Sequence, residues 1–260
     1  MRHRLTRFHL SLTVSTILAL AILMTSSGWL RVVALALLVA VQSALSARGV
    51  MRPQWRFFGP GICRGPTSTR RVALTFDDGP DPTTTPSLLD FLARRGIPAT
   101  FFCVGTRVMR HPEICQRALG EGHQLENHSL GHDWRTNLFS LARLRQDLTA
   151  AQSALIEATG SPPRFFRPPM GLTNLRVFQV AAELHLRVVG WTIGGRDQRA
   201  RDPETVVSRL LAGVSPGAIL LLHDGDQDPV RLLRILEMLV DKLEAQGYQC
   251  VRLDTLLDTP

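Results

Sequence analysis

The first 56 residues contain no aspartate or glutamate, although they contain seven arginines. Between Leu10 and Ala47, Arg31 is the only charged residue. The net charge of +8 belongs to this segment, because residues 57–260 carry 23 basic and 22 acidic residues. The rest of the chain has no cluster of basic and aromatic residues, which argues against nucleic acid as a partner.

Cysteine is also scarce. The chain has four, and no two of them form a Cys-x-x-Cys pair or match the spacing of a zinc ribbon. Nothing in their positions requires a disulfide, which favours a reducing compartment. Cys103 lies in an apolar run and is expected to be a small buried residue of the core.

The long uncharged stretch predicts a membrane anchor within residues 1–56. It exceeds the ~7–15 apolar residues of a secretory signal. Because one spanning helix needs ~20 residues, two transmembrane helices at about 8–27 and 29–47 fit better. Arginines flank both outer ends, so the positive-inside tendency predicts a domain on the cytoplasmic side of the membrane. The alternative is a single span, or a cleaved signal ending near residues 44–46, with an exported domain.

The remaining chain divides into a linker and one domain, which is expected to be catalytic. Residues 57–69 are rich in Gly and Pro and predict a linker. Within residues 70–257, strand-like runs are expected at 71–76, 98–104, 123–126, 164–166, 187–192, 217–222 and 248–252. Helical spacing separates them at 86–95, 113–119, 138–159, 174–184, 203–212 and 230–246. This alternation predicts an α/β fold with a parallel sheet, either barrel-like or open, whose active residues follow the strands.

Two motifs carry residue types suited to a catalytic metal. Asp77 and Asp78 end the first predicted strand, just before a Gly-Pro turn. His128 and His132 follow the third, and imidazoles four residues apart face the same way on a helical turn. With one Asp they would form a His2Asp set, which leaves positions open for water and substrate.

Two further motifs carry groups for proton transfer and charge stabilisation. Arg167 begins the turn Arg-Pro-Pro-Met-Gly, where its guanidinium could pair with a carboxylate and backbone N–H groups could serve an oxyanion. His223 closes an apolar strand and suits a general acid or base. Asp197 is available to orient that imidazole.

In order and spacing, Thr75-Phe-Asp-Asp-Gly79, His128-x-x-x-His132, Arg167-Pro-Pro-x-Gly171 and Leu222-His223 resemble the motifs of polysaccharide deacetylases. These proteins carry the NodB homology domain of carbohydrate esterase family 4. The resemblance covers about residues 70–257 and leaves out the membrane segment. It implies a deformed (β/α) barrel of about seven strands. It also implies metal-dependent removal of N-acetyl groups from an amino sugar in a glycan or lipid-linked saccharide.

The resemblance implies a role for each motif residue. Asp78, His128 and His132 would bind a divalent metal, which is usually zinc in this family. Asp77 would be the general base that activates water. His223 would be the general acid that protonates the leaving amine.

Supporting roles follow from the same resemblance. Arg167 would orient Asp77, the backbone N–H of Met170 would help hold the oxyanion, and Leu222 would line the pocket for the acetyl methyl group. The chain departs from the family at Met170, where an aromatic residue is usual. It departs again after Asp197, where Gln198 replaces a usual Trp. These departures leave the sugar and the acyl group open.

Two alternatives share the same fold. The domain could be a non-catalytic module that binds a glycan or a lipid, although the expected ligand set is complete. It could also be an N-deacylase of a non-sugar amide. The expected partners are therefore an N-acetylated amino sugar and, through residues 1–56, membrane lipid.

Overall fold

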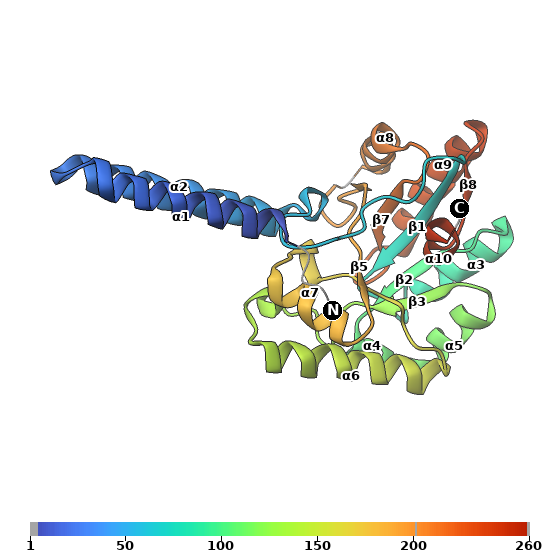
Figure 1. The fold of residues 1–260 in the computed structure, drawn as a ribbon. Helices are drawn as coiled ribbons and strands as arrows, with labels where there is room; N and C mark the ends of the chain where they lie inside the picture. The colour runs from blue at the N-terminus through green and yellow to red at the C-terminus, as the bar shows by residue number, and fades with distance from the viewer. Residues whose placement is uncertain (1–4, 201, 259–260) are drawn as a thin grey trace.

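The central sheet of the domain is built from parallel strands (Figure 1). The structure is a computed structural model that describes residues 5–200 and 202–258. The strand order is β5-β4-β3-β2-β1-β7-β6, and β8 pairs with the start of β1. The strands are β1 (Arg71–Asp77), β2 (Thr100–Cys103), β3 (Gln124–Asn127), β4 (Phe165–Phe166), β5 (Arg187–Val188), β6 (Ile193–Gly194), β7 (Ile219–His223) and β8 (Gln249–Cys250). The seven strands of the main path form a parallel half-barrel, which confirms the predicted α/β fold.

Helices surround this sheet. The helices of the domain are α3 (Thr85–Arg95), α4 (Gly105–Arg110), α5 (Pro112–Gly120), α6 (Leu141–Thr159), α7 (Leu175–Glu183), α8 (Pro203–Gly213), α9 (Pro229–Ala245) and α10 (Leu253–Leu257). Three short 3-10 helices are η1 (Pro53–Trp55), η2 (Trp134–Leu138) and η3 (Pro169–Gly171). The sequence prediction missed α4 and α10. It also began the helix at 138 too early, because Ser140 is its N-cap and accepts a hydrogen bond from the Arg143 N–H.

Alternation along β1 separates two hydrophobic layers. Val72, Leu74 and Phe76 pack in a cluster with the surrounding helices. Ala73 belongs to a smaller cluster inside the half-barrel, with Phe102 and Phe165. Because side chains alternate along a strand, Thr75 and Asp77 share the inner face with Ala73. The hydrophobic layers therefore direct the last side chain of β1 toward the interior.

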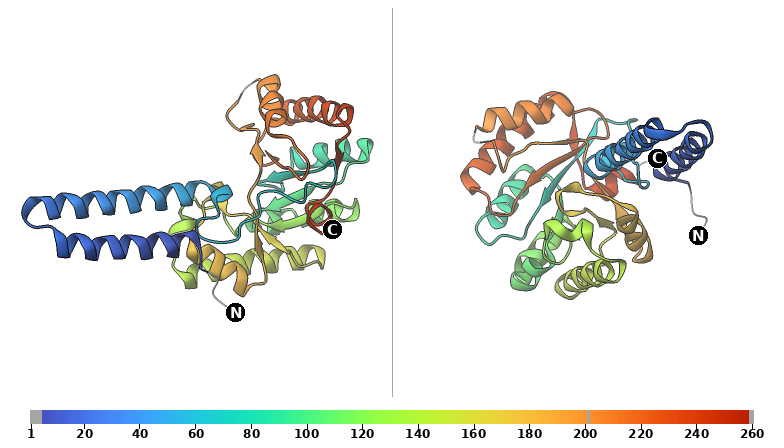
Figure 2. Two further views of the ribbon diagram at one scale, coloured as in Figure 1. Left: turned by 45° about the horizontal axis from the view of Figure 1, so that its top comes forward. Right: turned by 90° about the vertical axis from the view of Figure 1, so that its left-hand side faces the viewer.

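The N-terminal segment forms two long helices, α1 (Arg7–Thr25) and α2 (Gly28–Met51). They pack as an antiparallel hairpin that projects away from the domain (Figures 1 and 2). Both are long and apolar enough to cross a membrane, and the domain buries neither. Ser15 donates a hydrogen bond to the Gln42 side chain at 2.9 Å, so these polar groups are satisfied within the hairpin.

The segment 57–69, which was expected to be a linker, has no helix or strand of its own but lies against the domain. Phe57 and Phe58 are buried. Ile62 bridges to Val189 beside β5, and Arg64 bridges to Ala218 beside β7. The hairpin is therefore connected to the domain by packed rather than free chain.

Candidate active site

The carboxylate of Asp77 lies at the inner end of β1, where Arg167 holds it. The Arg167 guanidinium donates to Asp77 Oδ1 at 2.6 Å and to Thr75 Oγ1 at 2.9 Å. Its other terminal nitrogen donates to the Gly190 carbonyl at 2.9 Å, and its carbon lies 3.9 Å from the centre of the Phe102 ring. Arg167 is fully buried, so this ion pair is shielded from water and fixed in direction.

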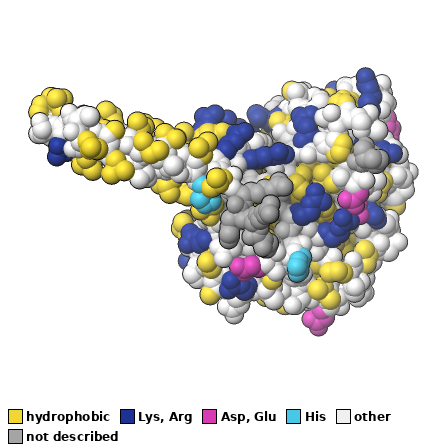
Figure 3. Space-filling model, viewed as in Figure 1, with side chains coloured by type: hydrophobic (Ala, Val, Ile, Leu, Met, Phe, Trp, Pro, Cys, Tyr) yellow, Lys and Arg dark blue, Asp and Glu magenta, His cyan; other side chains and the backbone are white. Residues whose placement is uncertain are grey.

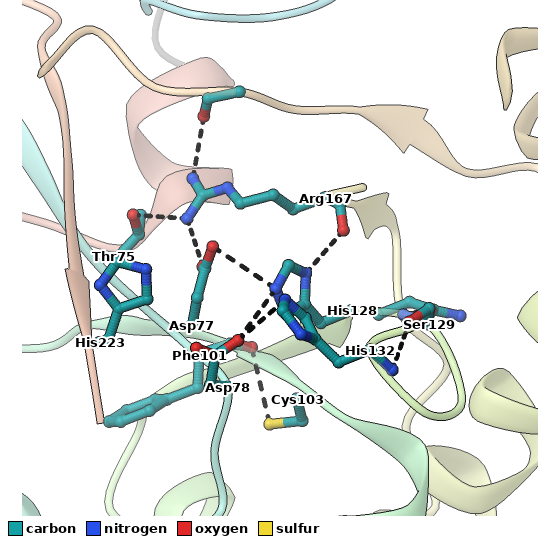
Figure 4. Close-up of polar contacts among 12 residues, drawn as sticks. Thr75, Asp77, Asp78, Phe101, Cys103, His128, Ser129, His132, Arg167 and His223 are labelled. Carbon is teal, nitrogen blue, oxygen red and sulfur yellow. Dashed lines mark hydrogen bonds and ion pairs between the residues drawn. The ribbon is translucent and has the colours of Figure 1, made fainter. Parts of the chain in front are cut away.

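Asp78, His128 and His132 bring three candidate metal-ligating atoms together (Figure 4). Asp78 Oδ1 lies 3.4 Å from His128 Nε2 and 3.2 Å from His132 Nε2. The candidate ligand atoms all lie within 4.8 Å of one another. Asp77 Oδ2 is 3.7 Å from His128 Nε2, so the second carboxylate is beside this cluster without joining it.

The two histidines are presented by a loop, so the expected helical turn is wrong. Ser129 and His132 have positive φ angles of 68° and 50°, which interrupt any helix. The buried Asn127 side chain accepts from the Ser129 N–H at 2.8 Å, and Ser129 Oγ accepts from the His132 N–H at 3.1 Å. The loop thus places the two rings 4.9 Å apart by local hydrogen bonds.

The hydrogen-bonding state of His128 and Asp78 leaves atoms of both residues available to bind a cation. His128 Nδ1 lies 2.7 Å from the Arg167 carbonyl, which can only accept, so Nδ1 carries the proton and Nε2 offers its lone pair to the cluster. Asp78 Oδ1 is buried and has no hydrogen-bond donor among the described residues. A buried carboxylate oxygen facing two imidazole nitrogens is the donor set that a divalent metal would satisfy.

The groups of the cluster shift one another's pKa values. Burial alone would lower the pKa of His128, but the charges of Asp77 and Asp78 raise it. Burial alone would raise the pKa of Asp78, but the close approach and charge of His128, with the charge of His132, hold it well below its ordinary value. Burial, followed by the neighbouring His128, lowers the pKa of His132. Asp78 is therefore a carboxylate at neutral pH, and His132 is a neutral imidazole able to ligate.

His223 approaches the same place from the neighbouring strand. It is paired in register with Asp77 across β1 and β7. The buried Asp197 accepts from the His223 backbone N–H at 2.8 Å and from ring Nδ1 at 3.0 Å. Burial would lower the pKa of His223, but the hydrogen bond and charge of Asp197, with the charges of Asp77 and Asp78, raise it to about 9. The proton that can be transferred is then on Nε2.

The other two predicted site residues lie differently. Met170 has a positive φ of 56° within η3, and its side chain is exposed. Leu222 is fully buried in the cluster that packs against the helices, on the face of β7 opposite to His223. The structure therefore does not bring the Leu222 side chain to the site, and Leu221 shares the inner face instead.

Sequence reasoning missed the contact of Gln198 and the position of Asp224 beside the candidate metal ligands. Gln198 donates its amide N–H to Asp78 Oδ2 at 2.8 Å, so the position that departs from the family pattern contacts a metal-ligand candidate. Asp224 is fully buried and accepts from Thr85 Oγ1 at 2.6 Å. Burial raises the pKa of Asp224 to about 7. Its position directly after His223 was the only sequence signal for it.

Comparison with known proteins places the chain among enzymes. Residues 64–189 match the family model described as polysaccharide deacetylase. A peptidoglycan-N-acetylglucosamine deacetylase of Bacillus cereus is 36% identical over 194 residues, which cover 74% of this chain and 90% of that one. A chitooligosaccharide deacetylase of Bradyrhizobium is 38% identical, with 70% and 89% covered. The chain spans only 39% of the length of a 37% identical peptidoglycan-N-acetylglucosamine deacetylase of Listeria monocytogenes, and 73% of this chain is matched.

Solved structures agree with the fold. The peptidoglycan N-acetylglucosamine deacetylase Bc1960 superposes with a TM-score of 0.73 at 28% identity, covering 76% of this chain and 93% of that one. A carbohydrate esterase family 4 pseudoenzyme of Bacillus anthracis superposes with a TM-score of 0.71 at 26% identity, covering 76% and 69%. The same fold is thus found in an enzyme and in a pseudoenzyme.

Proposed function

The chain belongs to the polysaccharide deacetylase family, and from this premise we propose that it is a metal-dependent hydrolase of N-acetylated amino sugars. The observation that supports this most directly is that the adjacent carboxylates of Asp77 and Asp78 have different surroundings. Asp78 faces two imidazoles, whereas Asp77 is held beside them by the buried Arg167. The buried ion pair fixes the direction of Asp77 beside the candidate metal ligands, as a general base for water requires.

The chain's own residues supply the remaining chemistry. Asp78, His128 and His132 would hold the metal, and we propose zinc because two imidazoles and a carboxylate are typical of catalytic zinc sites. When bound, the cation would supply Lewis acidity and lower the pKa of a water molecule toward ~7. Asp77 accepts the proton of the attacking water through Oδ2, because Oδ1 is engaged by Arg167.

The second half of the reaction requires a proton donor and oxyanion stabilisation. His223 donates from Nε2 to the leaving amine, because Asp197 holds Nδ1. We assign the oxyanion to the backbone N–H of Met170, whose left-handed conformation turns the η3 backbone sharply at this point. Cleavage of the amide then yields acetate and a free amino sugar.

Acetate release from N-acetylglucosamine oligomers tests this function. The full chain in detergent is stripped with a chelator and reloaded with zinc, and we expect activity to disappear and return. Asp77→Asn should lose turnover but keep zinc, whereas Asp78→Asn should lose both. Full activity of Asp77→Asn would refute the assignment. No acetate from any saccharide would favour the non-catalytic module, and acetate from simple acetamides alone would favour the non-sugar amide.

We further propose that α1 and α2 anchor the domain in a membrane, with the domain on the cytoplasmic side. The helix α1 has 19 residues and a mean hydropathy of 1.9, and α2 has 24 residues and a mean hydropathy of 2.0. Arginines at both outer ends of the hairpin support the cytoplasmic placement. Alkaline phosphatase fused after the last residue should be inactive in cells. An active fusion would place the domain on the exported side.

A further inference from the structure

The base of the hairpin is attached to the rim of the active site. The Thr173 N–H donates to the Val50 carbonyl at the end of α2, at 3.1 Å, two residues after η3. The Gln54 side chain in η1 donates to the Trp191 carbonyl at 3.1 Å. The hairpin also leaves the domain on the side toward which β1 points (Figures 1 and 2). Residues 48–58, named the hairpin root here, therefore lie beside the mouth of the site.

Helix length places this root at the level of the lipid headgroups. At 1.5 Å per residue, α1 and α2 span about 28 and 36 Å, against a hydrocarbon thickness of ~30 Å. The last turn of α2, which carries Arg48, then emerges into the headgroup region. Arg52 alone separates α2 from η1. With no spacer between them, a hairpin that crosses the bilayer holds the domain directly on its surface.

The domain offers an apolar rim on this side. Trp134 and Leu138 in η2 are each 65% exposed, and Met170 in η3 is 59% exposed. η2 follows the candidate ligand His132, and its Asn137 carbonyl accepts from the Asn174 side chain at 2.6 Å. Asn174 directly follows Thr173, whose N–H donates to the Val50 carbonyl at the end of α2. Trp134, Leu138 and Met170, named the site rim, thus stand on segments joined to the hairpin root, where Trp and apolar side chains favour a membrane interface.

The hairpin root carries positive charge and borders a groove on α2. No acidic residue precedes Asp77 in the chain, and basic side chains gather where the hairpin meets the domain (Figure 3). A groove of about 440 Å³ there is lined by small and apolar residues of α2, with Arg48 and Arg52 at its edge. Both arginines are exposed, and Arg48 lies over the Trp55 ring, 5.6 Å from its centre. An apolar groove edged by arginines complements a lipid chain that carries an anionic headgroup.

We propose that the site rim and the hairpin root form one membrane-facing surface, and that the substrate is an amino sugar attached to a membrane lipid through a phosphate linkage. This inference rests on the proposed function and on the hairpin crossing the membrane. The rim rests in the headgroup layer, Arg48 and Arg52 contact the phosphate, and the groove takes the first carbons of the lipid. A mouth held against the bilayer favours a headgroup-sized sugar over a thick polymer.

Two substrates presented to one enzyme preparation test this surface. The full chain is reconstituted in bilayer nanodiscs containing phosphatidylcholine and phosphatidylglycerol. Acetate release is measured from a polyprenyl diphosphate N-acetylglucosamine in the bilayer and from soluble N-acetylglucosamine tetramer. We expect a higher kcat/KM for the lipid-linked sugar. Soluble turnover without lipid-linked turnover would overturn the inference alone, and no turnover of either would overturn the proposed function with it.

Rim and groove variants localise the effect. Trp134→Ser combined with Leu138→Ser should lower kcat/KM for the lipid-linked sugar on the order of tenfold and leave the soluble tetramer unchanged. Arg52→Gln should raise KM for the lipid-linked sugar only. Ile156→Ser, an exposed apolar residue near the end of α6, is the matched control. Equal losses in the rim variant and the control, or equal losses on both substrates, would overturn the inference.

A binding measurement checks the same surface without catalysis. Bromine-labelled lipid quenches tryptophan that lies in the headgroup layer. The quenched fraction should fall in Trp134→Phe relative to the wild type, and it should not change in Ile156→Ser. No difference between Trp134→Phe and the wild type would contradict the placement of the rim in the bilayer.

Discussion

The Asp197→Asn variant should move the alkaline limit of activity. In the wild type, burial would lower the pKa of His223, and the Asp197 hydrogen bond and charge, with Asp77 and Asp78, raise it to about 9. A general acid acts only while protonated, so activity is present below this pKa and lost as the pH rises through it. The amide of Asn can still accept one hydrogen bond but removes the negative charge. Burial then dominates, and the pKa of His223 falls to its ordinary ~6.5 or below.

The size of the effect follows from the protonated fraction. At pH 8 a group with a pKa of about 9 is roughly 90% protonated, and one with a pKa of about 6.5 is roughly 3% protonated. We therefore expect kcat/KM at pH 8 to fall about thirtyfold, while the loss at pH 6 is small. The measurement is a profile of kcat/KM from pH 5.5 to 10 on soluble oligomer, with zinc content verified at each end.

Two controls separate this effect from misfolding. Asp90→Asn removes an exposed carboxylate that pairs with Arg117 on the helical surface, and its profile should match the wild type. His223→Gln should be inactive at every pH. If Asp197→Asn retains zinc and its alkaline limit coincides with that of the wild type, the pairing with Asp197 does not set the protonation of His223, and the reasoning fails.

Three further outcomes follow from contacts at the candidate site and at the opposite end of the sheet. Gln198→Ala should weaken zinc binding about tenfold, because Asp78 loses its orienting donor; a chelator competition measures this, and an unchanged affinity contradicts it. Arg167→Met should lower the free energy of unfolding by about 3 kcal/mol, because Asp77 stays buried and unpaired. Urea titration at pH 7 measures this, and a midpoint equal to that of the wild type would disprove it. Gly217→Ala should cost at least ~1 kcal/mol in the same titration, because φ is +78° and a Cβ would lie 2.4 Å from a carbonyl oxygen.

The sequence predicted the parts of the site that depend on strand ends. Asp77 and His223 each end an apolar run, and parallel strands bring such ends to one edge of a sheet. The candidate ligand set could be named for the same reason, because Asp78 follows β1 and the two histidines follow β3, which is separated from β1 only by β2. The fold class was equally accessible, since alternating strands and helices leave few arrangements.

The parts that failed depend on side-chain direction and on long-range contacts. Leu222 neighbours His223 in the sequence, but alternation along β7 turns it toward the helices. The spacing of His128 and His132 fits a helical turn, whereas Ser129 and Asn127 build a loop that achieves the same approach. Gln198 reaches Asp78 across 120 residues, a contact that no local pattern could indicate.

The Gly-Pro-rich segment after the hairpin has a structural role that its composition concealed. Gly190 accepts the third hydrogen bond of Arg167, the residue that holds Asp77. A Cβ at Gly190 would lie 3.3 Å from Pro53 and 2.9 Å from Cys63 Sγ, so the hairpin root and the following segment pack directly on this backbone. A glycine is required here because two layers meet at its Cα. The support of Asp77 therefore extends from Arg167 through Gly190 to the hairpin root, and the N-terminal hairpin and the candidate active site form one packed unit.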